Sequence, residues 1–138
     1  MIKVLISTDP RYPVNRKVLR KAVLEVFEKE KIVDIDAEVS VSVVGRRKMK
    51  ALTDKYLKDS RNHEVLSFPI EDPSTRSVRS GQEHGFAGAP DEVLRLGDVV
   101  LCWPEVLLCA AKDDVMVDAE VLKLTAHGVE HLLGKHHE

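Results

Sequence analysis

The feature that most constrains this chain is a set of histidines close to its C-terminus, spaced as H-x-x-x-H-x-x-G-x-x-H. His127 and His131 are four residues apart, so on a helix they lie about 6 Å apart along one face. Gly134 can end that helix, because glycine readily adopts a left-handed backbone conformation. The segment therefore predicts a helix that presents two imidazoles on one side, followed by a turn.

This spacing is typical of a catalytic metal centre. Two imidazole nitrogens one helical turn apart can bind one metal ion, and a third ligand can come from His137 or from its neighbour His136. Three protein nitrogens with one open position are the usual ligands of a catalytic zinc, so we expect one Zn²⁺ per chain. The alternative is the solvated remnant of an expression tag, but tags lack this helical register and the glycine.

Helical phase supports the metal site. At about 100° per residue, one set of side chains forms an apolar stripe: Val121, Leu122, Thr125, Val129, Leu132 and Leu133. His127 and His131 fall nearly opposite this stripe, so we expect them outside the core. Metzincin proteases share the spacing, but Gly128 stands where they have the glutamate that acts as general base, and Glu130 projects elsewhere. We predict a metal site without that base.

Length, composition and charge limit the class of protein. A chain of 138 residues with 43% hydrophobic residues is expected to form one soluble domain over residues 1–138. The net charge of −2 gives no nucleic-acid signature, so such a surface must be a local patch. Cys102 and Cys109 are expected to be buried free thiols. With no signal peptide or long apolar span, the sequence predicts a cytoplasmic protein without membrane contact.

Periodicity predicts the order β-α-β-α-β-β-α-α. Strands are expected over residues 3–7, 39–43, 65–68 and 94–103. Helices are expected over residues 18–27, 49–56 and 104–113, and from 118 onward. Asn15 and Asp118 are the expected caps, and the polar stretch 71–92 is expected to be a surface loop. The order implies an α/β (α+β) fold: a small mixed four-stranded sheet packed by helices, the last of which carries the histidines.

Three segments resemble one known family, the bacterial YbeY proteins. Residues 127–137 are similar to its H-G-x-L-H-L-L-G-Y-D-H, residues 65–69 to V-L-S-F-P, and residues 96–100 to L-G-D-I-V-I. The terminal block is the specific one. The resemblance implies a zinc-dependent, single-strand-specific endoribonuclease that acts in rRNA maturation, at the 16S 3′ end, and in ribosome quality control. It also implies single-stranded RNA and the small ribosomal subunit as partners.

Carried over to this sequence, the resemblance implies that His127, His131 and His137 are the metal ligands, because the family's aspartate falls at His136. Lys135 replaces the family's tyrosine, and Glu130 replaces an apolar residue.

The catalytic residues beyond the ligands are left open by the sequence. The family has Tyr-Arg before V-L-S-F-P, and its arginine is thought to assist catalysis, but Leu57 stands at that position here. Lys58 or Arg61 could supply the charge from nearby. Asp98, in a strand expected beside the site, is either a partner for a histidine N–H or simply a turn residue.

Three classes of function follow from these residues. The first is the endoribonuclease, for which basic residues between 46 and 61 could hold an RNA backbone, unless they are only a solvated helix face. The second is a non-catalytic zinc-containing module that binds the ribosome, which Leu57 keeps open. The third is a metalloprotease-like zinc hydrolase, which Gly128 disfavours. Ser67 is interpreted as a strand residue, and His63 and His84 as isolated and exposed.

Overall fold

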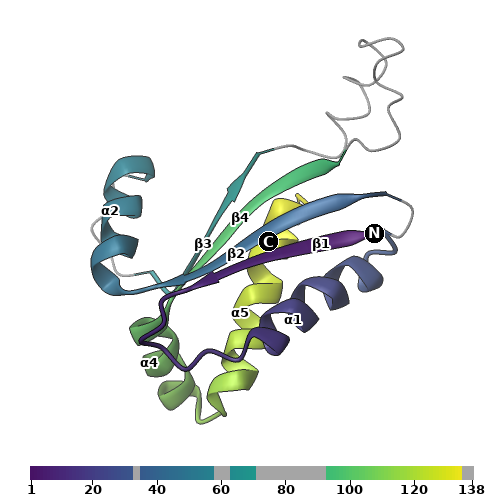
Figure 1. Ribbon diagram of the computed structural model, residues 1–138. Helices are drawn as coiled ribbons and strands as arrows, with labels where there is room; N and C mark the ends of the chain where they lie inside the picture. Colours follow the sequence, from purple (N-terminus) through teal and green to yellow (C-terminus); the bar gives the residue numbers. More distant parts are fainter. Residues whose placement is uncertain (33–34, 58–62, 71–92, 135–138) are drawn as a thin grey trace.

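The computed structural model describes residues 1–32, 35–57, 63–70 and 93–134. Its elements follow the predicted order, as Figure 1 shows. They are β1 (Ile2–Thr8), α1 (Arg16–Lys29), β2 (Ala37–Val44), α2 (Arg46–Tyr56), β3 (Val65–Pro69), β4 (Leu94–Cys102), α4 (Trp103–Asp113) and α5 (Val117–Leu132). The predicted loop 71–92 lies outside the described residues. Within the described part of the chain, no helix is both long and apolar enough to cross a bilayer.

The four strands form one mixed sheet in the order β1-β2-β4-β3 (Figure 1). β1 and β4 both pair with β2 in parallel, and β3 pairs with β4 in antiparallel fashion at the edge. Val39, Val41 and Val43 of β2 are all buried, whereas the serines between them are only half-buried. The predicted α/β fold with a mixed four-stranded sheet is therefore confirmed.

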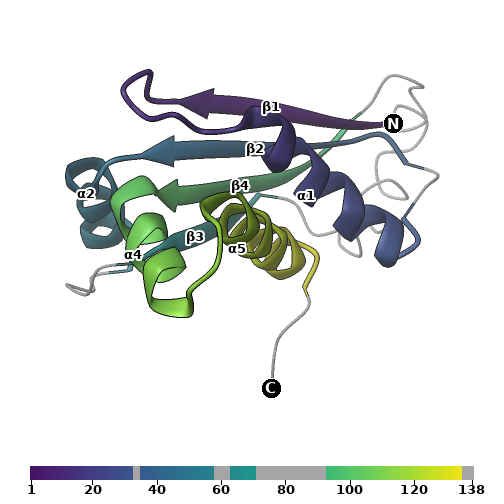
Figure 2. The same ribbon diagram turned by 90° about the horizontal axis from the view of Figure 1, so that it is seen from below.

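Helices lie on both faces of the sheet. α1 and α5 cover one face, and α2 lies against the other face at one end (Figures 1 and 2). Successive strand residues point to opposite faces, so neighbouring valines of β4 belong to different cores. Val99 packs in the larger core with Val129 of α5, and Val100 packs in the smaller core with Met49 of α2.

Local signals account for where the helices begin, with one correction. The Asn15 side chain accepts a hydrogen bond from the Lys17 amide at 3.1 Å, as expected of a cap, and Pro104 lies in the first turn of α4. The predicted cap at Asp118 is wrong, because Met116 is the N-cap of α5 and makes no side-chain cap hydrogen bond. Asp118 lies in the first turn, where its charge suits the helix dipole, and accepts from Asn15 Nδ2 at 3.2 Å.

Two glycines determine how closely α5 lies on the sheet. A Cβ atom at Gly128 would come within 2.7 Å of Val99 Cγ1. Gly97 has φ +147°, and a Cβ there would meet the carbonyl oxygen of Phe68 and lie 2.9 Å from Leu132 Cδ2. Gly97 follows an irregularity where the β2–β4 register shifts. The histidine-bearing helix is thus held against the sheet at positions where only glycine fits.

Candidate functional site

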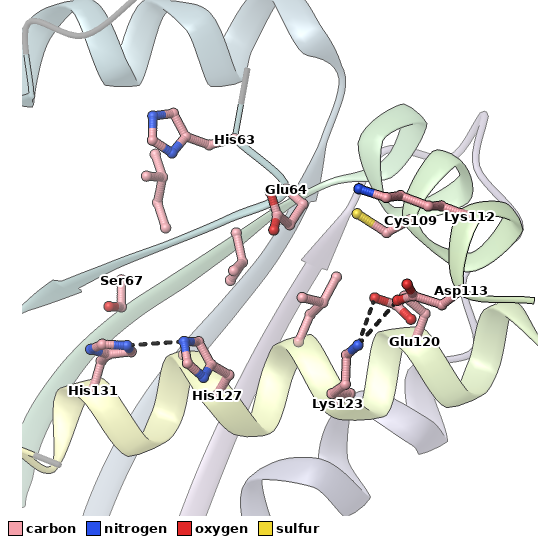
Figure 3. Close-up of a pocket in the computed structure, with 14 residues that line it drawn as sticks. His63, Glu64, Ser67, Cys109, Lys112, Asp113, Glu120, Lys123, His127 and His131 are labelled. Atoms are coloured by element: carbon pink, nitrogen blue, oxygen red, sulfur yellow. Dashed lines mark hydrogen bonds and ion pairs between the residues drawn. The ribbon is translucent and has the colours of Figure 1, made fainter. Parts of the chain in front are cut away.

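A cavity of ≈ 720 Å³ lies between β3, α4 and α5 (Figure 3). His127 and His131 reach it from α5, and Ser67 reaches it from β3. The described residues that line it are His63, Glu64, Val65, Leu66, Ser67, Cys109, Lys112, Asp113, Glu120, Lys123, Leu124, His127, Gly128 and His131. The histidines singled out in the sequence therefore face a space large enough for part of a substrate, together with several charged side chains.

The two histidines of α5 are held close together. Their Nε2 atoms are 3.0 Å apart, and both side chains are half-buried (Figure 3). Two nitrogens bound to one tetrahedral zinc at 2.0–2.1 Å would be separated by roughly 3.3 Å. The spacing of His127 and His131 thus fits two ligands of one such ion after a shift of a few tenths of an ångström.

The third predicted ligand cannot be placed. Both His136 and His137 lie outside the described residues. Among the residues that the structure describes, no group of three or more His, Cys, Asp or Glu side chains could hold a metal ion. The histidine pair thus fits a metal, while the assignment of His137 as third ligand stays a prediction.

Backbone geometry at the end of α5 agrees with the prediction from the sequence. α5 ends at Leu132, and Gly134 has φ +82°, the left-handed conformation expected of a glycine that stops a helix. Val129 and Leu132 are buried, which places the apolar stripe toward the core and the histidines toward the cavity. The direction in which the histidines point follows from this helical phase.

The structure also explains why the protease's general base is absent. Gly128 is buried against Val99, so any larger side chain at this position would collide with β4. Glu130 does not take its place, because its Oε2 accepts a hydrogen bond from Lys29 Nζ of α1 at 3.0 Å and Glu130 does not line the cavity. This hydrogen bond raises the pKa of Lys29. The two α5 histidines can therefore be present without the glutamate base that accompanies them in metzincin proteases.

Of the three catalytic candidates Asp98, Lys58 and Arg61, the structure describes only Asp98. Asp98 is adjacent to Val99, whose side chain faces α5, so Asp98 lies on the other face of the sheet. There it lines a second cavity with Ser40 and Tyr56 rather than the histidine cavity. The structure thus does not bring Asp98 to the histidines. Lys58 and Arg61 lie outside the described residues.

Several charged residues of the cavity were missed in the sequence. Lys123 precedes His127 by four positions and so shares its helix face, which is the one signal that could have revealed it. Lys123 Nζ lies 3.3 Å from Asp113 Oδ2 and 3.4 Å from Glu120 Oε2 (Figure 3). These two carboxylates, Asp113 first, raise the pKa of Lys123, which keeps the ammonium charged. Glu64, just before β3, adds a further carboxylate to the cavity.

Comparison with known proteins identifies the family. The sequence matches the model of the family Endoribonuclease YbeY over residues 7–138. The chain belongs to the YbeY family. The endoribonuclease YbeY of Dehalococcoides mccartyi strain BAV1 is 30% identical over 138 residues, covering 99% of this chain and 84% of that protein. The YbeY of Thermoanaerobacter sp. strain X514 is 30% identical over 122 residues, covering 88% of this chain and 74% of that one.

A solved structure agrees at the level of the fold. The solution structure of a Thermotoga maritima protein covers 100% of this chain with a TM-score of 0.56 at 23% identity, and the chain covers 75% of that protein. The YbeY family expected from the three sequence segments is confirmed, and with it the expected endoribonuclease class.

Proposed function

We propose that this YbeY protein is a zinc-dependent, single-strand-specific endoribonuclease that forms one domain. It acts in rRNA maturation, including the 16S 3′ end, and in ribosome quality control on the small subunit. Membership of the family supports the class of reaction. The single observation that carries the metal is the 3.0 Å separation of the His127 and His131 Nε2 atoms at the wall of the cavity.

His127, His131 and His137 would hold the zinc ion. When bound, zinc would act as a Lewis acid toward a phosphoryl oxygen. The imidazoles contribute as neutral donors through Nε2, so their other ring nitrogen carries the proton. Gly128 keeps the helix pressed to β4, which holds both imidazoles at the cavity wall.

A proton acceptor is available from another element. Glu64 extends into the cavity in Figure 3, and among the described residues it is the carboxylate that enters from the sheet side, opposite α5. A Glu64 carboxylate oxygen would accept the proton of the attacking group, either a water or the RNA's own 2′-hydroxyl. Glu120 is less suited, because it is 2% exposed and already ion-paired with Lys123.

The basic residues of α2 are proposed to hold RNA outside the cavity. Arg47 and Lys48 line a separate hollow of ≈ 520 Å³ beside the loop that follows β1, away from the histidines. Arg46 bonds to Glu105 of α4 at 2.8 Å, so its guanidinium has a structural partner. A local basic patch of this kind attracts a phosphate backbone even when the net charge is −2.

The first test measures metal content by mass spectrometry and cleavage of a labelled single-stranded RNA, using untagged protein. We expect about one zinc per chain, with both zinc and cleavage lost in His127→Ala. His84→Ala is the matched control, since His84 lies outside the terminal block, and it should retain both. Glu64→Gln should keep the zinc and lower the cleavage rate by about 10²–10⁴-fold.

Other outcomes separate the alternatives. Zinc without cleavage in the wild-type protein would favour the ribosome-binding module, an alternative that Leu57 in place of an arginine keeps open. Absence of zinc after the metal has been offered would contradict the metal site. Peptide hydrolysis that disappears in His131→Ala would revive the zinc hydrolase reading.

A further inference from the structure

We propose that Lys123 is a substrate-positioning residue whose ammonium binds an RNA backbone phosphate, and that this ammonium is ion-paired with Asp113 when RNA is absent. The inference deepens the proposed function and rests on it. It assigns a place for the phosphate chain inside the histidine cavity, and it assigns Asp113 the role of a competitor for RNA.

Position is the first argument. Lys123, His127 and His131 are spaced by four residues on α5, so they lie in a row on one helix face and all three line the same cavity (Figure 3). Each step along this row is about 6 Å. An RNA strand bound along this row would thus have its reacting phosphate at the histidines and a neighbouring phosphate near Lys123.

The second argument is that only one of the two ion pairs of Lys123, the one with Glu120, holds its ammonium firmly. Glu120 is 2% exposed, and a buried carboxylate that loses its counter-charge is strongly destabilised. Glu120 therefore keeps the ammonium in place through the 3.4 Å contact. Asp113 belongs to α4 and its side chain is 42% exposed, so its 3.3 Å ion pair with Lys123 is a weak surface pair.

The third argument concerns hydrogen-bond capacity. A lysine ammonium has three N–H donors, and the two carboxylates account for two of them. A phosphate oxygen can use the third donor, or it can replace the exposed Asp113 without uncovering the buried Glu120. Lys123 is thus a preformed phosphate-binding group. Its exposed partner Asp113 can be exchanged for a phosphate, while Glu120 stays in place.

The test measures binding of the purified protein to a fluorescein-labelled single-stranded 2′-O-methyl RNA by fluorescence anisotropy over a range of salt concentrations. The probe lacks the 2′-hydroxyl, and a gel confirms that it remains intact. Asp113→Asn should tighten binding by about 2- to 5-fold, since it removes a weak competing charge. Lys123→Met should weaken binding and lower the slope of log K against log salt by about 1.

Control variants distinguish a loss of phosphate binding at Lys123 from a loss of folding and from a general change in charge. Lys123→Met leaves Glu120 unpaired, so the double variant Lys123→Met/Glu120→Gln tests the same loss of the cation without a buried charge. Lys123→Arg should retain most of the affinity. Lys21→Met is the charge-matched control, because Lys21 is an exposed lysine of α1 with an i,i+4 partner, and it should bind as the wild type does.

A purely structural role for Lys123 predicts a different result. Asp113→Asn would then leave RNA affinity unchanged or reduce it, and the double variant would keep the wild-type salt slope; either finding overturns the inference. If the wild-type protein cleaves and binds RNA while these variants bind equally well, only the inference fails. If the wild-type protein neither binds nor cleaves RNA, the proposed function fails with it.

Discussion

Gly128 shows how a single missing side chain affects both packing and chemistry. The space that a Cβ atom would need is already filled by Val99, so α5 approaches β4 more closely than a larger residue would permit. The same contact excludes the glutamate that metzincin proteases place after their first histidine. The departure from the protease pattern therefore has a steric cause as well as a chemical consequence.

Gly128→Ala should lower the free energy of unfolding by about 1–2 kcal/mol, because overpacking outweighs the better helix propensity of alanine. The measurement is urea denaturation of the single variants Gly128→Ala and Val99→Ala and of the double variant. Shortening Val99 makes room for the new methyl group, so the double variant should lose less stability than the two single losses together. Simple additivity would argue against the contact.

At the scale of elements, the position of α5 depends on β4 at a second place. Gly97 has φ +147° at the register shift of β4, and a Cβ atom there would collide with Leu132, the residue beside His131. Strand irregularities often redirect side chains next to functional sites. Here the irregularity supports the end of α5 that carries the second histidine.

Gly97→Ala should lower the free energy of unfolding by more than about 2 kcal/mol, since backbone strain and steric collision add up. It should also weaken zinc binding in the folded fraction, as His131 is displaced. Gly134→Ala is the control: its φ is +82°, but among the described residues no atom beyond its chain neighbours lies within 4 Å of the added Cβ. This variant should lower the free energy of unfolding by only about 1–2 kcal/mol, because alanine is strained in the left-handed conformation. Equal losses in both variants would exclude a steric contribution at Gly97.

The described part of the molecule has two cores, one on each face of the sheet, and Cys102 belongs to the smaller one. Cys102 is 1% exposed in the core under α2, whereas Cys109 is half-buried on α4 at the cavity. The prediction of two buried thiols is thus right for Cys102 and only partly right for Cys109. Burial is the main cause that raises the pKa of both thiols, which disfavours the reactive thiolate.

Both thiols should therefore react slowly with a disulfide reagent at pH 8, and Cys109 should react first. Cys102 should become modified only as fast as the protein opens, because its side chain is almost completely buried in the folded state. The rates are measured in the variants Cys109→Ser and Cys102→Ala, each of which leaves one thiol. Rapid modification of Cys102 without global unfolding would mean that α2 detaches on its own.

The sequence by itself determined the order of the elements, the buried face of β2 and the end of α5 shortly before Gly134. It also determined that His127 and His131 share a helix face. These features are local, since periods of two and 3.6 residues and the conformational freedom of glycine act over a few residues.

Only the tertiary structure decided the strand order β1-β2-β4-β3 and placed Asp98 on the face away from the histidines. It alone brought Asp113, from another helix, to Lys123. Such contacts join residues far apart in the chain, and they depend on how close two packed elements can come, which no local pattern encodes.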